Sequence, residues 1–226
     1  MKVDFHIHTN FSYDGVNSPQ EIVEAAISQE VDCLCITDHN ETRGAIEALR
    51  FASAKPVLVI PGIEVRSREG DILGINVRKL IPRGLPASEV IKEIDRQGGL
   101  AVIAHPFAWP HQFKGDLKKT FKESLGLSLA IEVFNASVPN FFNEKALNLV
   151  KELNLPFTAG SDAHGTGFVG KAFLELPGDN LSAEQIIEGV EKKRGEVKKG
   201  EISLFVKLKW EAKRNISKFK KGKLKV

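Results

Sequence analysis

Five of the six histidines in this 226-residue chain lie in four short motifs. His6 and His8 lie in DFHIHT, His39 in TDHN, His105 in AHPF and His164 in SDAH. Imidazole nitrogens are common metal ligands. Two histidines separated by one strand residue point to the same face about 7 Å apart, so both can reach one ion. A single His-x-His pair is weak evidence, but the four motifs together predict a polynuclear metal site.

Each motif follows or closes an apolar segment that is typical of a β-strand, and helical segments lie between the strands. The expected strands cover residues 3–8, 31–37, 56–65, 71–77, 100–105, 129–135, 155–164 and 171–176. The expected helices cover residues 18–29, 41–53, 87–97, 143–153 and 182–194. Ser18 and Glu21 form a predicted capping box around Pro19. This alternation predicts a parallel α/β sheet with right-handed crossovers.

Six of the expected strands end in polar residues that could do chemistry. These residues are His6 and His8, Asp38 and His39, Glu64, His105, Glu132, and Asp162 and His164. An open sheet binds its ligand at one switch point, whereas the loops after barrel strands all meet at one mouth. The sequence therefore predicts a TIM-like barrel of irregular form, with the metal site at the C-terminal mouth of its strands.

The same motifs resemble those of the polymerase and histidinol phosphatase (PHP) family, in order, from residue 3 to about residue 165. They are His6-Ile7-His8-Thr9, Thr37-Asp38-His39, Gly62-Ile63-Glu64, Ala104-His105-Pro106 and Ser161-Asp162-Ala163-His164. The resemblance implies a distorted (β/α)7 barrel that holds two or three divalent metal ions and acts mainly on phosphoesters.

The resemblance also implies a distribution of ligands. The first metal would take His6, His8, Glu64 and Asp162; the second would share Glu64 and add His105; the third would take Asp14, His39 and His164. Glu64, His105, Asp162 and His164 would be the catalytic residues. Nitrogen and oxygen ligands without thiolate suit Mn, Zn or Fe, and do not choose among them.

Three further residues are candidates for the site. Many PHP proteins carry a histidine where this chain has Asp71, so Asp71 either ligates the second metal or leaves that ligand missing. Glu132 lies at a strand end and either joins the site or fixes a loop. Arg66 follows the Gly62-Ile63-Glu64 motif and could bind phosphate, although a solvated arginine is the commoner outcome.

The predicted reaction is hydrolysis of a phosphomonoester or nucleotide by water that bound metal ions acidify. The chain offers no Gly-rich nucleotide loop of the G-x-x-x-x-G-K-[ST] type. One alternative is an exonuclease-like enzyme for short oligonucleotides. Another is a non-catalytic, metal-bound scaffold that recruits nucleic acid or protein, which the nearly complete ligand set disfavours.

Charge divides the chain into a body and a tail. Residues 198–226 carry 11 Lys/Arg and 2 acidic residues, a net +9, so residues 1–197 carry −6 of the total +3. We therefore expect one barrel over 1–197 and a basic appendage over 198–226, which is either solvated or binds nucleic acid. Cys33 and Cys35 are expected to be reduced and buried. No long apolar run or signal peptide is evident, so a cytoplasmic protein without a membrane partner is expected.

Overall fold

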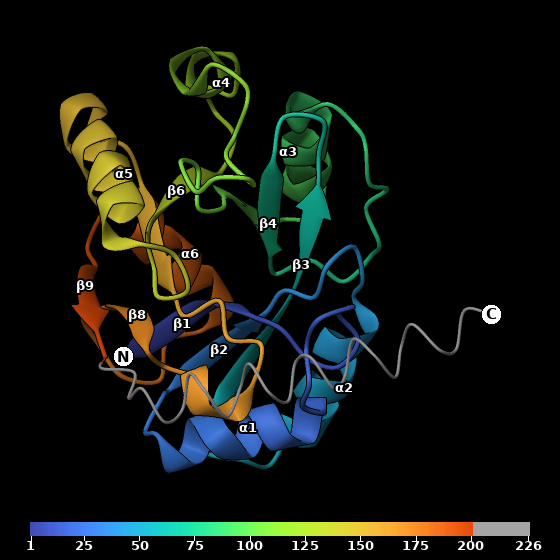
Figure 1. The fold of residues 1–226 in the computed structure, drawn as a ribbon. Coiled ribbons are helices and arrows are strands. Elements are labelled where there is room, and N and C mark those ends of the chain that lie inside the picture. Colours follow the sequence, from blue (N-terminus) through green and yellow to red (C-terminus); the bar gives the residue numbers. More distant parts are fainter. Residues whose placement is uncertain (201–226) are drawn as a thin grey trace.

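The computed structural model describes residues 1–200, which form a nine-stranded sheet flanked by helices (Figure 1). The strands are β1 (Lys2–Ile7), β2 (Cys33–Ile36), β3 (Leu58–Arg66), β4 (Asp71–Ile75), β5 (Leu100–Ile103), β6 (Leu129–Asn135), β7 (Phe157–Gly160), β8 (Ala172–Glu175) and β9 (Glu196–Lys199). The helices are α1 (Pro19–Ser28), α2 (Arg43–Ala52), α3 (Ala87–Arg96), α4 (Leu117–Glu123), α5 (Asn140–Leu153) and α6 (Ala183–Glu191), with a 3-10 turn at Thr166–Phe168.

The sheet curls into a nearly closed barrel. Its strand order is β7-β6-β5-β4-β3-β2-β1-β8-β9. Beyond the end of β7, Ala163 pairs with Ile7 of β1, and the His8 amide donates to the Ala163 carbonyl over 2.8 Å. These bonds bring the first and seventh strands together at the mouth. The expected α/β fold, a distorted TIM-like barrel, is confirmed.

Strand β4 departs from the expected parallel arrangement, because it runs antiparallel to both β3 and β5. A short turn between β3 and β4 causes this reversal: the Ser67 amide donates to the Gly70 carbonyl over 2.9 Å. The hairpin has a consequence for the site. The first residue of β4, Asp71, pairs with Arg66 at the end of β3 and therefore lies at the mouth.

Side chains that alternate along the strands divide the core into an inner and an outer set, as the pleat requires. Phe5, Cys33, Cys35 and Val102 belong to one buried cluster, which α6 closes with Ile186 among other residues. Outer residues pack beneath α1 and α2, beneath α3, and beneath α5. Both cysteines are buried free thiols, as expected.

The predicted starts of α1 and α6 are confirmed by their hydrogen bonds, whereas α5 begins at Asn140, three residues before its predicted start. Ser18 and Glu21 form a reciprocal capping box at α1, and Ser182 forms one at α6. Strand β9 was not predicted, because its four residues are Glu-Val-Lys-Lys and carry no apolar pattern. It pairs antiparallel with β8 and crosses the predicted boundary between residues 197 and 198. Most of the basic tail, residues 201–226, lies outside the described part of the chain.

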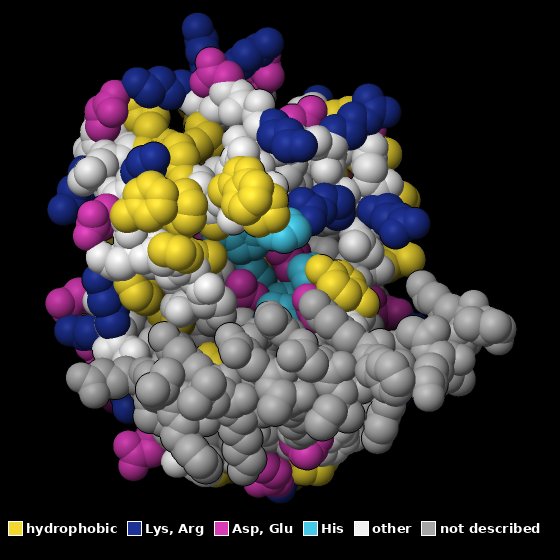
Figure 2. Space-filling view, in the orientation of Figure 1, with side chains coloured by type: hydrophobic (Ala, Val, Ile, Leu, Met, Phe, Trp, Pro, Cys, Tyr) yellow, Lys and Arg dark blue, Asp and Glu magenta, His cyan; other side chains and the backbone are white. Residues whose placement is uncertain are grey.

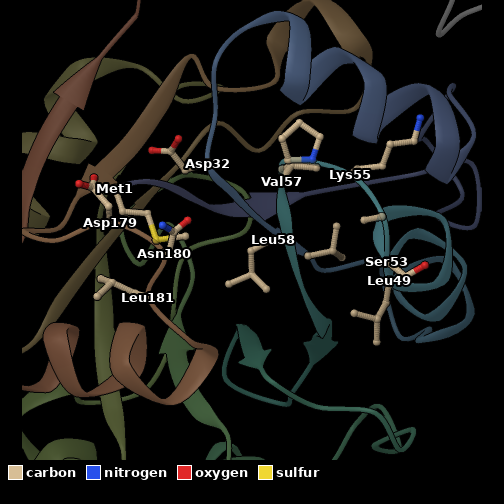
Figure 3. Close-up of a pocket in the computed structure, with 13 residues that line it drawn as sticks. Met1, Asp32, Leu49, Ser53, Lys55, Val57, Leu58, Asp179, Asn180 and Leu181 are labelled. Carbon is tan, nitrogen blue, oxygen red and sulfur yellow. The ribbon is translucent and has the colours of Figure 1, made fainter.

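A second cavity lies at the end of the barrel opposite the mouth (Figure 3). It measures about 590 Å³, and its lining includes Asp32, Lys55, Leu58 and Asp179. Its lining contains no histidine. No helix within residues 1–200 has the length and apolar character needed to cross a membrane.

Candidate metal centre

The four histidine motifs converge at the mouth of the barrel, around a cavity of about 120 Å³. His6 lies near the end of β1, and His8 directly follows the strand. Both side chains are fully buried, because β1 has a neighbouring strand on each side. The cavity is lined by Tyr13, Asp14, His39, Glu64, Arg66, Asp71, His105, His111, Asp162 and His164. The eight predicted ligands thus come together at the mouth. Seven come from the ends of β1, β2, β5 and β7 and the loops that follow them, and Glu64 comes from β3.

Glu64 is the centre of this arrangement. Its Oε2 atom lies 3.4 Å from Nε2 of His6, 3.4 Å from Nε2 of His8 and 2.8 Å from Nδ1 of His39. Its Oε1 atom lies 3.4 Å from Nε2 of His105. The side chain is 1% exposed. Each carboxylate oxygen can bind a different ion, so this position agrees with the predicted sharing of Glu64 between two metals.

Two aspartates complete the set. Asp162 Oδ1 lies 3.5 Å from Nε2 of His6, 3.2 Å from Nε2 of His8 and 3.5 Å from Nδ1 of His164. Asp14 Oδ1 lies 3.3 Å from Nε2 of His164 and 3.6 Å from Nε2 of His39. Within residues 1–200, three compact donor groups result. They are His6–His8–Asp162, His6–Glu64–His105 and His8–His39–His164.

Several polar atoms of this cluster are buried in a way that suits a bound cation better than hydrogen bonds within the cluster. Buried polar atoms are nearly always hydrogen-bonded. Here His6 Nε2, His8 Nε2, Asp14 Oδ1 and both oxygens of Glu64 are buried and make no well-formed hydrogen bond, since their nearest polar neighbours are the other donors of the same cluster. They converge from several directions, and their lone pairs are suited to a shared cation. A cation would remove the cost of burying unpaired polar atoms, about 1–3 kcal/mol for each.

The pKa values of the histidines in the metal-free cluster also indicate a site for cations. Burial lowers the pKa of His39, but Glu64 and Asp14 outweigh burial and raise it to about 11. Burial, with His164 and His39 nearby, lowers the pKa of His8 to about 3, so this imidazole is neutral and keeps a lone pair for a ligand bond. Protons on some of the histidines therefore stand in for metal charge against the carboxylates, and metal ions would displace them.

Comparison with known proteins gives the family. Residues 4–157 match the PHP domain, and residues 140–194 match the PHP-associated region. The chain belongs to the PHP family. An uncharacterised protein of Methanocaldococcus jannaschii is 36% identical over 165 residues, covering 68% of this chain and 94% of its own. The predicted resemblance is therefore confirmed.

Two other PHP relatives are informative. A two-domain protein from Bacteroides vulgatus, which contains a predicted PHP-like metal-dependent phosphoesterase, shares the fold with a TM-score of 0.72 and 22% identity, over 88% of this chain and 65% of its own. A 5'-3' exoribonuclease from Haemophilus influenzae is 37% identical over 86 residues, covering 36% of this chain and 31% of its own.

Behind the PHP ligands, Glu132 holds the rings in place. Its Oε1 atom accepts from Nδ1 of His6 over 3.0 Å. Its Oε2 atom accepts from the His105 amide over 2.8 Å and from Nδ2 of Asn135 over 3.1 Å. A proton on Nδ1 of His6 leaves the lone pair on Nε2, which faces Glu64 and Asp162. Glu132 therefore orients ligands from outside the three donor groups.

A second buried carboxylate, Asp38, supports His8 and the first loop. Nδ1 of His8 lies 3.0 Å from the Ser12 hydroxyl, which donates to Asp38 Oδ1 over 2.9 Å. Thr9 donates to Asp38 through its amide and its hydroxyl, both over 2.7 Å. Thr9 and Ser12 thus fix the first loop against Asp38. Gly44, in the first turn of α2, packs so closely on Asp38 and Thr9 that a Cβ there would overlap both.

Two of the predicted ligand residues have backbone conformations that L-amino acids seldom adopt. Asp162 has φ of +52° and His105 has φ of +28°. Such conformations cost about 1–3 kcal/mol each and are found mainly where function requires a particular side-chain direction. Here each lies two residues beyond the end of a strand, and its side chain lines the cavity.

The remaining candidates lie on the rim. Asp71 belongs to none of the three donor groups, and its Oδ1 lies 3.0 Å from Nε of Arg66. An Nη atom of Arg66 lies 2.8 Å from Nδ1 of His111. His111, the one histidine outside the four motifs, also lines the cavity. Tyr13 was not predicted; its ring stacks on His39 with centroids 4.8 Å apart, and only its position beside Asp14 could have suggested this.

Proposed function

We propose that this PHP-family chain is a metal-dependent phosphoesterase that hydrolyses a phosphomonoester or a nucleotide. The observation that carries the proposal is the set of buried, unpaired donor atoms that converge on Glu64 at the barrel mouth. Such a set is costly unless cations bind it. Mixed nitrogen and oxygen donors suit Mn, Zn or Fe.

The proposed ligands divide among two or three ions. His6, His8, Glu64 and Asp162 would hold the first; Glu64 and His105 would hold the second; Asp14, His39 and His164 would hold the third. When bound, the ions supply Lewis acidity and make a coordinated water acidic near neutral pH. Glu64, His105, Asp162 and His164 are the proposed catalytic residues because all four line the cavity.

Other residues of the chain would orient the ligands and bind the phosphoryl group. Glu132 and Asp38 fix the orientation of His6 and of His8, so little reorganisation is needed when substrate arrives. Arg66 is held at the rim by Asp71 and His111 and is 45% exposed. A guanidinium has five N–H donors, so several remain for phosphoryl oxygens. We assign Arg66 to the non-bridging oxygens, and Asp71 to holding Arg66 rather than a metal.

The test is a hydrolysis panel. Phosphomonoesters, nucleotides, diesters and short RNA are incubated with protein supplied with Mn, Zn or Fe, and released phosphate or nucleotide is measured. Hydrolysis of at least one ester is expected, and it should depend on the ion. The absence of hydrolysis with any ion would contradict the proposal.

A second candidate is nuclease activity on short oligonucleotides. The observation that favours it is the similarity to the Haemophilus influenzae exoribonuclease, which extends over 86 residues. In this case the basic residues after Gly200 would hold the strand by phosphate contacts. Truncation after Gly200 should then reduce turnover of short RNA but leave small phosphoesters unaffected. Equal RNA turnover by the truncated and full-length proteins would remove the tail from this proposal.

A further inference from the structure

Two exposed aromatic side chains belong to loops that also carry residues of the metal centre. Tyr13 is 60% exposed and Trp109 is 75% exposed, although tyrosine and tryptophan are largely buried on average in folded proteins. Tyr13 lies in the loop after β1, next to Asp14. Trp109 lies in the loop after β5, between His105 and His111. Figure 2 shows hydrophobic side chains on both sides of the histidines at this mouth.

The size of the cavity forces most of a substrate onto this rim. Its volume of about 120 Å³ equals roughly four water molecules, whereas pockets that enclose small organic ligands measure about 300 Å³ or more. A phosphoryl group fits inside, but a sugar with a base does not. The group esterified to the phosphate must therefore lie outside the cavity, where Tyr13 and Trp109 are exposed.

The position of Tyr13 suits a flat ligand. One face of its ring stacks on His39 at an interplanar angle of 17° and a centroid distance of 4.8 Å. Because a proposed metal ligand supports this face, the ring is held at a fixed height above the cavity.

The loop of Trp109 is tied to the site at both ends. The Ala108 amide donates to the His105 carbonyl over 2.9 Å, and the Phe113 amide donates to the Pro106 carbonyl over 2.8 Å. His111 contacts Arg66. The backbone that carries Trp109 is therefore held beside the cavity, while its side chain stays exposed.

We propose that Tyr13 and Trp109 determine specificity by stacking on the nucleobase of a nucleotide whose phosphate enters the metal centre. This inference rests on the proposed function and specifies its substrate class. Stacking of a base on an aromatic side chain contributes about 1–3 kcal/mol and tolerates any base, since every base has a π-face. The structure therefore favours substrates with a nucleobase over equivalent phosphoesters without one.

The experiment compares adenosine 5'-monophosphate with ribose 5-phosphate, which carries the same ester on the same sugar without the base. For the wild-type protein with bound metal, kcat/KM for the nucleotide should be higher by about 5- to 150-fold. Trp109→Ala and Tyr13→Leu should each lower this ratio by at least about fivefold, whereas Trp109→Phe and Tyr13→Phe should preserve most of it. Leu80→Ala is the matched control, because Leu80 is 59% exposed and away from the cavity lining.

A ratio near one in the wild type, or an unchanged ratio in Trp109→Ala and Tyr13→Leu, would overturn the inference and leave the phosphoesterase proposal intact. A preference for phosphotyrosine over the nucleotide would also overturn it. Hydrolysis of neither ester would instead refute the proposed function. Tryptophan fluorescence would then decide the inference: the nucleotide should quench it in the wild type but much less in Trp109→Phe, and equal quenching would overturn the stacking role.

Discussion

Replacement of Glu132 by glutamine tests how the fold prepares a metal ligand. The carboxylate is 1% exposed and accepts from His6, from the His105 amide and from Asn135. Glutamine has the same shape but only one accepting oxygen. If that oxygen keeps the donors of His105 and Asn135, the new NH2 group faces Nδ1 of His6. That nitrogen must then accept, and the imidazole proton moves to Nε2.

This tautomer removes the lone pair that should bind the first metal, because Nε2 of His6 is the atom that faces Glu64 and Asp162. The opposite amide orientation places NH2 against two donors, and unpaired buried donors cost about 1–3 kcal/mol. Glu132→Gln should therefore weaken metal binding by about 10- to 100-fold, which is about 1.4–2.7 kcal/mol.

The assay is competition for metal against a chromogenic chelator, with far- and near-UV circular dichroism to confirm the fold. Glu123→Gln is the matched control, because Glu123 lies on α4 with an exposed side chain. It should bind metal as the wild type does. If Glu132→Gln is folded and also binds metal with wild-type affinity, the assignment of Glu132 to the orientation of His6 is refuted.

Other predictions address the remaining parts of the site. Gly44→Ala should weaken metal binding and destabilise the fold by up to about 2 kcal/mol in urea unfolding. Overlap with the buried Asp38 costs about 1–3 kcal/mol, from which a helix-propensity gain of about 1 kcal/mol is subtracted. Greater stability than the wild type, with unchanged metal binding, would contradict this. Arg66→Met should lower kcat/KM by about 10- to 150-fold, whereas Arg96→Met, at an exposed position, should not. In the metal-free protein burial lowers the pKa of His39, but neighbouring carboxylates raise it to about 11, so its proton leaves when an ion binds. Metal affinity should therefore rise with pH, and calorimetry in two buffers of different ionisation enthalpy should detect proton release; no release would count against the site. The raised pKa of His39 stabilises the metal-free protein fully below the unfolded-state pKa of 6.5, and this stabilisation is lost as the pH rises through about 11. The melting temperature of the stripped protein should therefore fall at alkaline pH by more than that of the metal-loaded protein.

The sequence predicted those features that depend on local patterns. The capping box of α1 follows from Ser18 and Glu21, three residues apart, and the position of each histidine motif follows from the apolar strand before it. Parallel strands of a barrel bring their C-terminal ends to one mouth, so the sequence alone predicts that the histidine motifs form a cluster. The described residues bear out this convergence, while the assignment of ligands to particular ions remains a prediction.

Contacts between residues that are distant in sequence could not be predicted from local patterns. The contact between Glu132 and His6 joins residues 126 positions apart. The pairing of Asp71 with Arg66 depends on a hairpin that reverses β4, and the sequence left both roles of Asp71 open. The stacking of Tyr13 on His39 brings together two βα-loops. In each case tertiary packing decides which of several polar neighbours a side chain meets.

The most direct test of the central claim is to measure bound metal and phosphate release on the same samples. Protein stripped with a chelator should release no phosphate and should regain activity when Mn, Zn or Fe is restored, with at least two ions bound per chain. His8→Ala and Asp162→Ala should stay folded, bind less metal and lose turnover, because both residues belong to one donor group. Wild-type turnover by either variant, or by fully stripped protein, would contradict the account.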